Sequence, residues 1–341
     1  MGITHISERE IEAVASQILE RNVEPVIRLR LRRDILGQKE PGGKLLSIRR
    51  AVDRSRNIGI LRDERSADGG WGAFHSASPA PGKKIVSTEA GVRRALALGL
   101  EKSHPVLRQA RAYILDMLQG KEEYPDYNEK NDRWPTGRRL FLASTLALID
   151  PANTVLDKDR KLWREIALRT FQSGRYSADD EDNAHRELTG ASVKNSYLVI
   201  NNRYALNILG SAKELLPRHI ERLLVQWLFG RPDGIGYLET SLGRPPSAGN
   251  PGQLDRWFSS LELLSNSFPS WIEYGKGAID WIWGRRGDNG YWDFGPRSRN
   301  SIFLPLSDNW RAGVNRQIDW TLRALLLLHK YCVACRCNKG K

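Results

Sequence analysis

The turn Asp68-Gly69-Gly70-Trp71-Gly72 decides the fold, because turns of the same kind recur along the chain. They combine glycine, aspartate and aromatic residues, and their markers after Gly70 are Asp126, Asp179, Gly234 and Gly290. Successive markers lie roughly 55 residues apart, and a regular period of this kind indicates stacked supersecondary units. The sequence therefore predicts a repeat protein.

Two helical patterns fill the interval between one turn and the next. In the first interval, residues 88–100 and 104–119 place apolar side chains three and four positions apart, on one face of each helix. Ser103 or its neighbour is expected to cap the second helix, with Pro105 in its first turn. Later helices are expected at 138–149 and 161–171, 194–209 and 217–229, and 253–266 and 271–283, with a closing helix over 315–331.

Strand-like alternation of β-branched residues is nearly absent, so the sequence predicts an all-α chain. About five to six helical hairpins favour an α/α toroid, because that number brings the first hairpin beside the last. Residues 1–44 are expected to form an N-terminal helical arm, with helices over 8–21 and 26–36, and residues 45–341 the toroid as a single globular unit. The arm is expected to pack on the outer helices through four apolar residues, Val26, Ile27, Leu29 and Leu31.

The composition fits a globular protein, since 40% of the 341 residues are hydrophobic. The longest apolar run covers residues 324–328, far short of the roughly 20 residues that a membrane-spanning helix needs. The first ten residues carry charges and lack the apolar centre of a signal peptide. We therefore expect a soluble, cytoplasmic protein.

The formal net charge of +13 favours anionic partners. Nucleic acid is disfavoured, because no RNA-binding signature and no zinc finger occurs, whereas peripheral contact with an anionic membrane surface stays open. The three cysteines, Cys332, Cys335 and Cys337, have a metal-like spacing, but a second pair of ligands is missing from the sequence around them. They are interpreted as thiols of a frayed tail, and neither a metal nor a cofactor is predicted.

Two of the turns carry a family resemblance. Gly-Gly-Trp-Gly at 69–72 and Gly-Asp-Asn-Gly-Tyr-Trp-Asp-Phe-Gly at 287–295 resemble the glycine-tryptophan signatures of the terpenoid-cyclase and protein-prenyltransferase β-subunit superfamily. The similarity covers roughly residues 45–331 by period and turn type, and residues 24–37 resemble the opening of bacterial squalene-cyclase-like or prenyltransferase-like proteins. This resemblance implies an α/α barrel that binds an apolar isoprenoid in its central cavity.

An acidic stretch, Asp180-Glu181-Asp182-Asn183, resembles the Asp-x-Asp-Asp motif of class II terpene cyclases, with Asn in place of the last Asp. The resemblance makes Asp182 the proton donor in a repeat turn, with a pKa raised by burial and by Asp180 and Glu181. His185 is a potential hydrogen-bond partner, and Glu181 or Glu187 are alternative acids. An exposed acidic loop is the commoner explanation of such a stretch, and a cation site is a third. The Asp-x-Cys zinc pair of protein prenyltransferases is missing from the sequence, which disfavours protein prenylation.

A second group of polar residues lies at the other turns. If the turns on one side of a toroid converge, carboxylates distant in sequence meet there, as the two acids of a glycoside hydrolase must. His75 is a substrate-binding candidate in this group, and the alternative is a loop histidine bonded to its own turn. The remaining members are Glu89, Asp126, Glu129, Asp132, Glu239, Asp288, Asp293 and Asp308.

Tryptophans near the turns have two expected roles. A structural role, pinning one unit to the next through the indole N–H, is favoured for Trp71, Trp281 and Trp292. Substrate binding by aromatic faces is predicted for Trp134, Trp257 and Trp310, each of which lies beside an arginine. The basic residues Lys83, Lys84, Arg93, Arg94, Arg297 and Arg299 fit either contacts to a diphosphate or ordinary solvated surface.

Three hypotheses about function follow. The first is a cyclase-like or prenyl-handling protein that binds an apolar isoprenoid and starts cyclisation with Asp182. The second is a carbohydrate-active α/α-barrel enzyme with paired carboxylates. The third is a non-catalytic toroid that binds a ligand or a partner protein. The wall of the central cavity distinguishes them: aromatic and dry for an isoprenoid, acidic and wet for a sugar, and filled for a scaffold.

Overall fold

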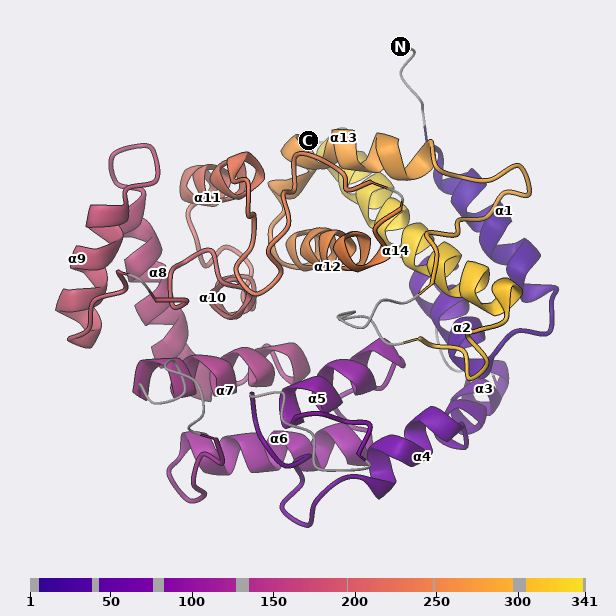
Figure 1. Ribbon diagram of the computed structural model, residues 1–341, viewed down its shortest axis with the longest axis horizontal. Helices are drawn as coiled ribbons and strands as arrows, with labels where there is room; N and C mark the ends of the chain where they lie inside the picture. The colour runs from indigo at the N-terminus through magenta and orange to yellow at the C-terminus, as the bar shows by residue number, and fades with distance from the viewer. Residues whose placement is uncertain are drawn as a thin grey trace. The chain divides into compact units, whose positions relative to one another are not determined.

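The computed structural model describes residues 6–38, 43–75, 83–126, 135–194, 196–247, 249–296 and 305–339. In this part of the chain the regular structure is helical, and β-pairing is confined to an isolated bridge between Asn202 and Gly236 (Figure 1). The predicted all-α class is therefore confirmed for the described residues. None of their helices is both long enough and apolar enough to cross a membrane.

The chain divides into two compact units. Unit 1 comprises Met1–Gly59, Phe229–Asp233 and Leu238–Lys341, and unit 2 comprises Ile60–Leu228 and Gly234–Tyr237. The helices of unit 1 are α1 (Glu8–Leu19), α2 (Pro25–Arg30), the π-helical turn η1 (Leu31–Ile35), α3 (Gly43–Asp53), α12 (Pro251–Ser267), α13 (Trp271–Trp283) and α14 (Gly313–Lys339). Helix α4 (Arg56–Asp63) runs from unit 1 into unit 2.

Unit 2 holds the helices between the two long segments of unit 1. They are α5 (Thr88–Ala97), α6 (Pro105–Leu118), α7 (Pro135–Ile149), the 3-10 turn η2 (Thr154–Leu156), α8 (Asp157–Thr170), α9 (Ala178–Thr189), α10 (Arg203–Leu209) and α11 (Arg218–Gly230), whose last two residues belong to unit 1. Helix α7 packs against α5, α6 and α10, and α8 packs against α9 and α10. The predicted helix pairs 88–100 with 104–119 and 138–149 with 161–171 correspond to α5 with α6 and α7 with α8.

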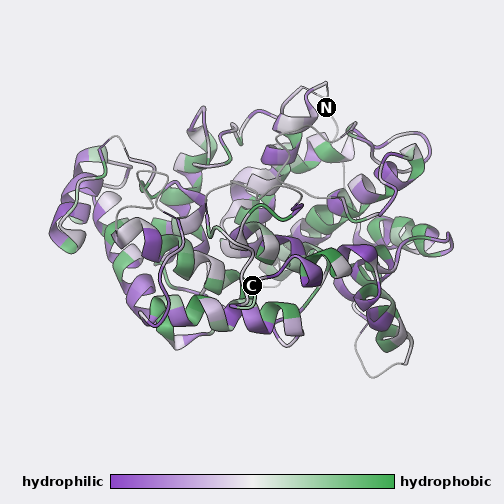
Figure 2. Cartoon of the chain, turned by 60° about the horizontal axis from the view of Figure 1, so that its bottom comes forward, coloured by the Kyte–Doolittle hydropathy of each residue, from purple (hydrophilic) through white to green (hydrophobic). Residues whose placement is uncertain are grey.

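The amphipathic pattern of each helix determines which face is buried. In α6, Val106, Ala110 and Ile114 are almost fully buried, whereas Arg108 is exposed. The same division into apolar and polar positions is visible on other helices (Figure 2). His104 caps α6, because its Nδ1 accepts a hydrogen bond from the backbone N–H of Val106 at 3.3 Å, as expected for a neighbour of Ser103.

The N-terminal arm is an integral part of unit 1. Helix α1 begins with a capping box between Ser7 and Glu10 and packs against α14 (Figure 1). Helix α2 and η1 also contact α14. The expected burial of the apolar arm residues is confirmed, since Val26, Ile27, Leu29 and Leu31 are at most 2% exposed.

Two of the glycine-tryptophan turns have the same hydrogen bonds. The indole N–H of Trp71 donates to the carbonyl of Leu61 in α4 at 2.9 Å, and that of Trp292 donates to the carbonyl of Ile282 in α13 at 2.6 Å. The backbone N–H of each tryptophan donates to a threonine hydroxyl of a following helix, both at 3.0 Å. Each tryptophan thus joins the end of one helix to another, which confirms the structural role predicted for both.

The same turns require glycine at defined places. Gly69 and Gly290 have φ angles of +101° and +83°, in the region that favours glycine. Gly91 of α5 is needed for a different reason, because a Cβ there would lie 2.4 Å from Cε3 of Trp71. The absence of a side chain at Gly91 lets α5 approach the buried indole ring.

Candidate functional site

The acidic stretch around Asp182 is helical. We expected a repeat turn there, and this expectation is wrong: the residues form the first half of α9. The side chain of Ser177 caps the helix by accepting a hydrogen bond from the N–H of Asp180 at 3.2 Å. Acidic residues in the first turn of a helix interact favourably with its positive dipole end, which explains why three of them begin this helix.

Asp182 is held as an ionised carboxylate. Its Oδ1 accepts hydrogen bonds from the hydroxyl of Ser192 at 2.5 Å and from the backbone N–H of Val193 at 2.9 Å, and its Oδ2 accepts one from Arg186 at 2.8 Å. The Ser192 and Arg186 hydrogen bonds hold the pKa of Asp182 well below its usual range. Our expectation of a raised pKa is therefore wrong. An ionised carboxylate tied to a loop has no proton to give, so the geometry does not support Asp182 as the donor.

The carboxylates next to Asp182 in sequence differ in their surroundings. Glu181 is buried and accepts hydrogen bonds from the Tyr176 hydroxyl at 2.9 Å and from the backbone N–H of Ile200. Asp180 is half-buried, and Glu187 is exposed in an ion pair with Arg169. These contacts fix the loop after α9 to the helix.

His185 is buried beside Trp163 with its ring edge toward the indole, at 5.4 Å between ring centroids. Its Nε2 has no hydrogen-bond partner in the described part of the chain and lies 4.0 Å from Oε1 of Glu181. Burial lowers the pKa of His185 to about 4, although the charge of Asp182 opposes this shift. The ring is therefore neutral at pH 7.

We expect His185 to make unfolding easier in acid. Its pKa is lower in the folded chain than the ordinary value of 6.5, so the unfolded chain binds more protons between these values and stability falls as pH falls. At pH 4.5 protonation of this group lowers the free energy of unfolding by about 2.5 kcal/mol. Urea denaturation of the wild type and of His185→Phe at pH 7.5 and pH 4.5 measures it.

Because other carboxylates also titrate in this range, the informative quantity is the difference between the two proteins. The phenylalanine variant should lose less stability than the wild type on going from pH 7.5 to pH 4.5. Equal losses in both proteins would show that protonation of His185 is not opposed by the fold.

The tryptophans expected to bind substrate have different surroundings. Trp257 is fully buried in unit 1, where its ring contacts Phe258 and Trp281 and its indole N–H donates to the carbonyl of Leu242 at 3.3 Å. Trp310 is half-buried, and its indole N–H lacks a hydrogen-bond partner among the described residues. Trp134 lies outside the described residues.

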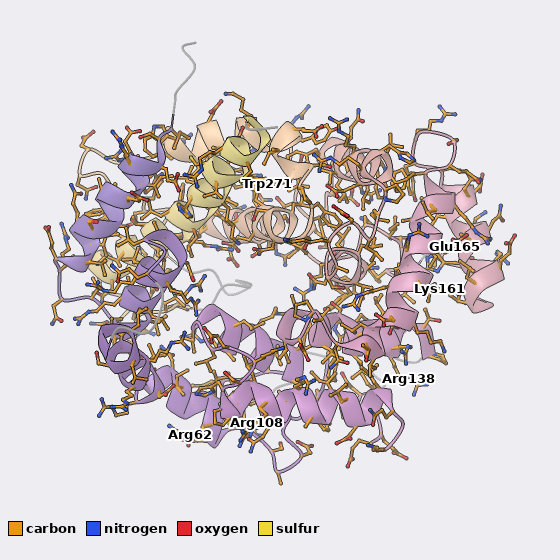
Figure 3. The ribbon with its side chains drawn as sticks, turned by 180° about the vertical axis from the view of Figure 1, so that it is seen from behind. Arg62, Arg108, Arg138, Lys161, Glu165 and Trp271 are labelled. Carbon is orange, nitrogen blue, oxygen red and sulfur yellow. The ribbon has the colours of Figure 1, made fainter. Side chains whose placement is uncertain are left out.

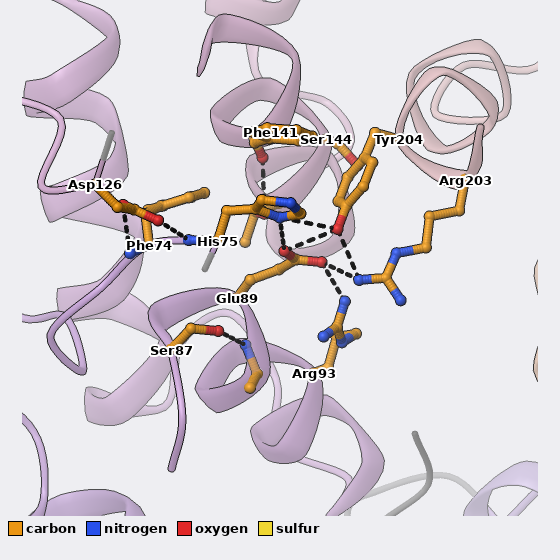
Figure 4. A network of polar contacts seen from close by, with 12 residues as sticks. Phe74, His75, Ser87, Glu89, Arg93, Asp126, Phe141, Ser144, Arg203 and Tyr204 are labelled. Atoms are coloured by element: carbon orange, nitrogen blue, oxygen red, sulfur yellow. Dashed lines mark hydrogen bonds and ion pairs between the residues drawn. The ribbon is translucent and has the colours of Figure 1, made fainter. Parts of the chain in front are cut away.

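His75 is the centre of a polar network in unit 2 (Figure 4). Its Nδ1 lies 3.0 Å from Oε2 of Glu89 and 3.2 Å from the hydroxyl of Tyr204, and that hydroxyl donates to the same Oε2 at 3.0 Å. Asp126 holds the loop that carries His75. Its two carboxylate oxygens accept hydrogen bonds from the backbone N–H groups of Phe74 at 2.8 Å and of His75 at 2.9 Å. The loop that carries His75 is thus fixed from two sides.

Glu89 is the buried anion of this network. The guanidinium groups of Arg93 and Arg203 both contact its Oε1, on the side of the carboxylate away from His75 (Figure 4). Burial alone would raise the pKa of Glu89, but the two arginines and His75 overcome this effect and hold the pKa well below its usual range. Since an ionised carboxylate can only accept hydrogen bonds, Nδ1 of His75 carries a proton.

Aromatic rings surround His75. Phe141 of α7 stacks on the imidazole with ring centroids 3.9 Å apart, and Tyr204 and Tyr237 meet it edge-on at 5.5 and 5.6 Å. Tyr237 has a φ angle of +66°, which is rare for a residue with a large side chain. The adjacent Gly236 fixes this backbone, because it pairs with Asn202 in the isolated bridge.

Only some of the predicted turn residues meet. His75, Glu89 and Asp126, three members of the second group of polar residues, come together in unit 2. In unit 1, Asp293 pairs with Arg316, Glu239 with Arg256 and Asp308 with Asn57, and Asp288 is exposed. Residues Glu129, Asp132, Arg297 and Arg299 lie outside the described residues.

The sequence did not single out Phe141, Arg203 and Tyr204. Their positions within helical patterns gave no sign of a site, and Tyr204 is 129 residues from His75 in sequence. The described residues contain no group of three or more histidine, cysteine or acidic side chains arranged to hold a metal ion. Comparisons with protein-family models, with curated proteins and with solved structures found no match for this chain.

Proposed function

We propose that the chain is an enzyme whose acid–base group is His75, oriented by Glu89 in unit 2. The observation that carries this proposal is the 3.0 Å contact between Nδ1 of His75 and Oε2 of a buried, ionised Glu89. A carboxylate that fixes the proton on Nδ1 gives Nε2 the lone pair of a general base, and it stabilises the imidazolium after proton transfer.

The surroundings of His75 favour an apolar substrate. Phe141, Tyr204 and Tyr237 present aromatic rings around the imidazole, and aromatic faces bind apolar chains and stabilise positive charge that develops on them. Isoprenoids are therefore the substrate class that we propose, in agreement with the resemblance of the glycine-tryptophan turns. Cyclisation started by Asp182 is not part of the proposal, because that carboxyl is ionised.

Two alternatives are less well supported. A glycoside hydrolase needs one protonated and one ionised carboxyl group, whereas Glu89 is ionised and Asp126 is engaged with the backbone. A purely binding or structural role is favoured by one observation, the small exposed fraction of the His75 side chain, 6%. The experiment must therefore distinguish turnover from binding.

The test compares the wild type with His75→Gln on a panel of isoprenoid alcohols, hydrocarbons and diphosphates, with products followed by mass spectrometry. We expect the wild type to convert at least one compound and the variant to be slower by a factor of about 100 or more, the usual contribution of an acid–base group. His219→Gln, which changes an exposed histidine of α11, is the matched control and should equal the wild type.

A second measurement needs no substrate. Nitrogen-15 NMR of the imidazole should show the proton of His75 on Nδ1 at neutral pH. Failure of the wild type to convert any member of the panel, or equal rates for wild type and His75→Gln, would contradict the proposed reaction and favour the binding role.

A further inference from the structure

Two arginines share the single carboxylate of Glu89. Arg93 and Arg203 share a single carboxylate, and both contact the same oxygen, Oε1. The other oxygen, Oε2, is occupied by His75 and Tyr204. The carboxylate of Glu89 therefore balances only one of the two guanidinium charges that contact it, and Arg203 is only 12% exposed, where an unbalanced charge is costly.

The two guanidinium groups also have hydrogen-bond donors to spare. A guanidinium has five N–H donors in a fixed fork. Among the described residues, the side chain of Arg93 donates to Glu89, and that of Arg203 donates to Glu89 and to the hydroxyl of Tyr204. Most of the ten N–H groups are therefore available for another acceptor.

Arg93 gives this cluster access to solvent. Its side chain is 33% exposed, compared with 12% for Arg203 and 4% for Glu89. Arg93 is therefore the more accessible of the two arginines, and the guanidinium of Arg203 lies close to it at the same carboxylate (Figure 4). Paired N–H groups match the oxygens of a carboxylate or a phosphate, which accept two parallel hydrogen bonds from one guanidinium.

We propose that Arg93 and Arg203 bind an oxyanion, a carboxylate or a phosphate, carried by the ligand of unit 2. The anion supplies the negative charge that Glu89 alone does not provide. This inference rests on the proposed function in placing the ligand beside His75, but it concerns binding and not proton transfer. The proposed substrate is therefore an apolar chain with a negatively charged end group.

Isothermal titration calorimetry with dodecanoate, dodecyl phosphate and dodecanol tests the proposal on the full chain, below the concentrations at which the probes form micelles. The three probes share one apolar tail and differ in charge. The wild type should bind at least one of the anions about tenfold or more tightly than the alcohol, which is the usual contribution of hydrogen bonds to a charged group. The tighter of the two anions identifies the end group as carboxylate or phosphate.

The variant Arg93→Gln removes the more exposed arginine and leaves Glu89 paired with Arg203, so the fold should persist. This variant should bind the anions no more than about twofold more tightly than the alcohol, because the guanidinium charge of Arg93 is gone. Arg108→Gln is the matched control, since it removes the same charge from an exposed position of α6 (Figure 3). This control should keep the wild-type preference for the anion.

The preference should also persist in His75→Gln, because the imidazole takes no part in holding the anion. That variant separates the two proposals. A retained anion preference together with wild-type turnover in His75→Gln would contradict the acid–base role and leave the anion site standing. Equal affinity of the wild type for anions and alcohol, the absence of binding of both anions, or an unchanged preference in Arg93→Gln would overturn the anion site.

Discussion

Replacing Glu89 with alanine is expected to lower the free energy of unfolding by about 3 to 5 kcal/mol, because it removes the carboxylate from a buried charge cluster and leaves its partners. The guanidinium of Arg203 is 12% exposed and would stay inside without a counter-ion. The hydroxyl of Tyr204 and the Nδ1 of His75 would lose their shared acceptor as well. Chemical denaturation followed by circular dichroism measures the change.

Two further variants show whether burial and charge cause this effect. Glu165→Ala removes a carboxylate from a half-exposed position of α8, labelled in Figure 3. There Glu165 forms an ion pair with Arg169. Exposed ion pairs contribute about 0 to 1 kcal/mol, so this control should be nearly neutral. Glu89→Gln keeps the shape of the side chain, and its loss in free energy of unfolding should lie between those of Glu89→Ala and Glu165→Ala. If Glu89→Ala lowers the free energy of unfolding no more than Glu165→Ala does, the charges around Glu89 contribute little to stability.

Replacing Trp71 with alanine should lower the free energy of unfolding by about 3 to 5 kcal/mol, the usual cost of removing a buried aromatic side chain. The ring is 1% exposed and packs against Gly91, and its indole N–H holds the end of α4. The cavity cannot close easily, because the backbone of the turn is fixed by Thr88. Urea denaturation of the variant and the wild type provides the measurement.

Tyr197→Ala is the matched control for Trp71, since it removes a large aromatic ring that is 62% exposed in the same unit. Its effect should stay within about 0.5 kcal/mol, as for most surface substitutions. Similar costs for the two variants would mean that Trp71 does not hold α4 and α5 together.

Most helices with regular apolar spacing could be predicted from sequence, whereas α3, α4 and α9 were not expected and α10 begins later than expected. Helix α10 begins at Arg203 and not at 194, although Leu198 and Ile200 are apolar and buried. These side chains enter the core from a loop, and apolar spacing alone does not distinguish a loop from a helix. Helix α9 was missed because its acidic first turn was interpreted as a surface turn, although Ser177 and the acidic run form a recognisable helix start.

The site was predictable only in part. His75, Glu89 and Asp126 were named because they flank the repeat turns, and the structure brings them together. The low pKa of Asp182 depends first on Ser192, which reaches the carboxylate from a loop that no sequence pattern links to it, and then on Arg186 of the same helix. Hydrogen-bond partners of this kind follow from tertiary structure, so the charge state of a carboxyl group cannot be deduced from its neighbours in sequence.

The pairing of α1 with α14 has a consequence for biosynthesis. Unit 1 contains both Met1–Gly59 and Leu238–Lys341, and α1, which packs mainly on α14, lacks this partner until α14 has been translated. Nearly all of unit 2 is one continuous segment, Ile60–Leu228, and most of its partners emerge soon after one another. Contacts between distant segments form slowly, and apolar surface that waits for a late partner is open to aggregation. The buried face of α1 therefore stays uncovered in the nascent chain until its partner α14 emerges.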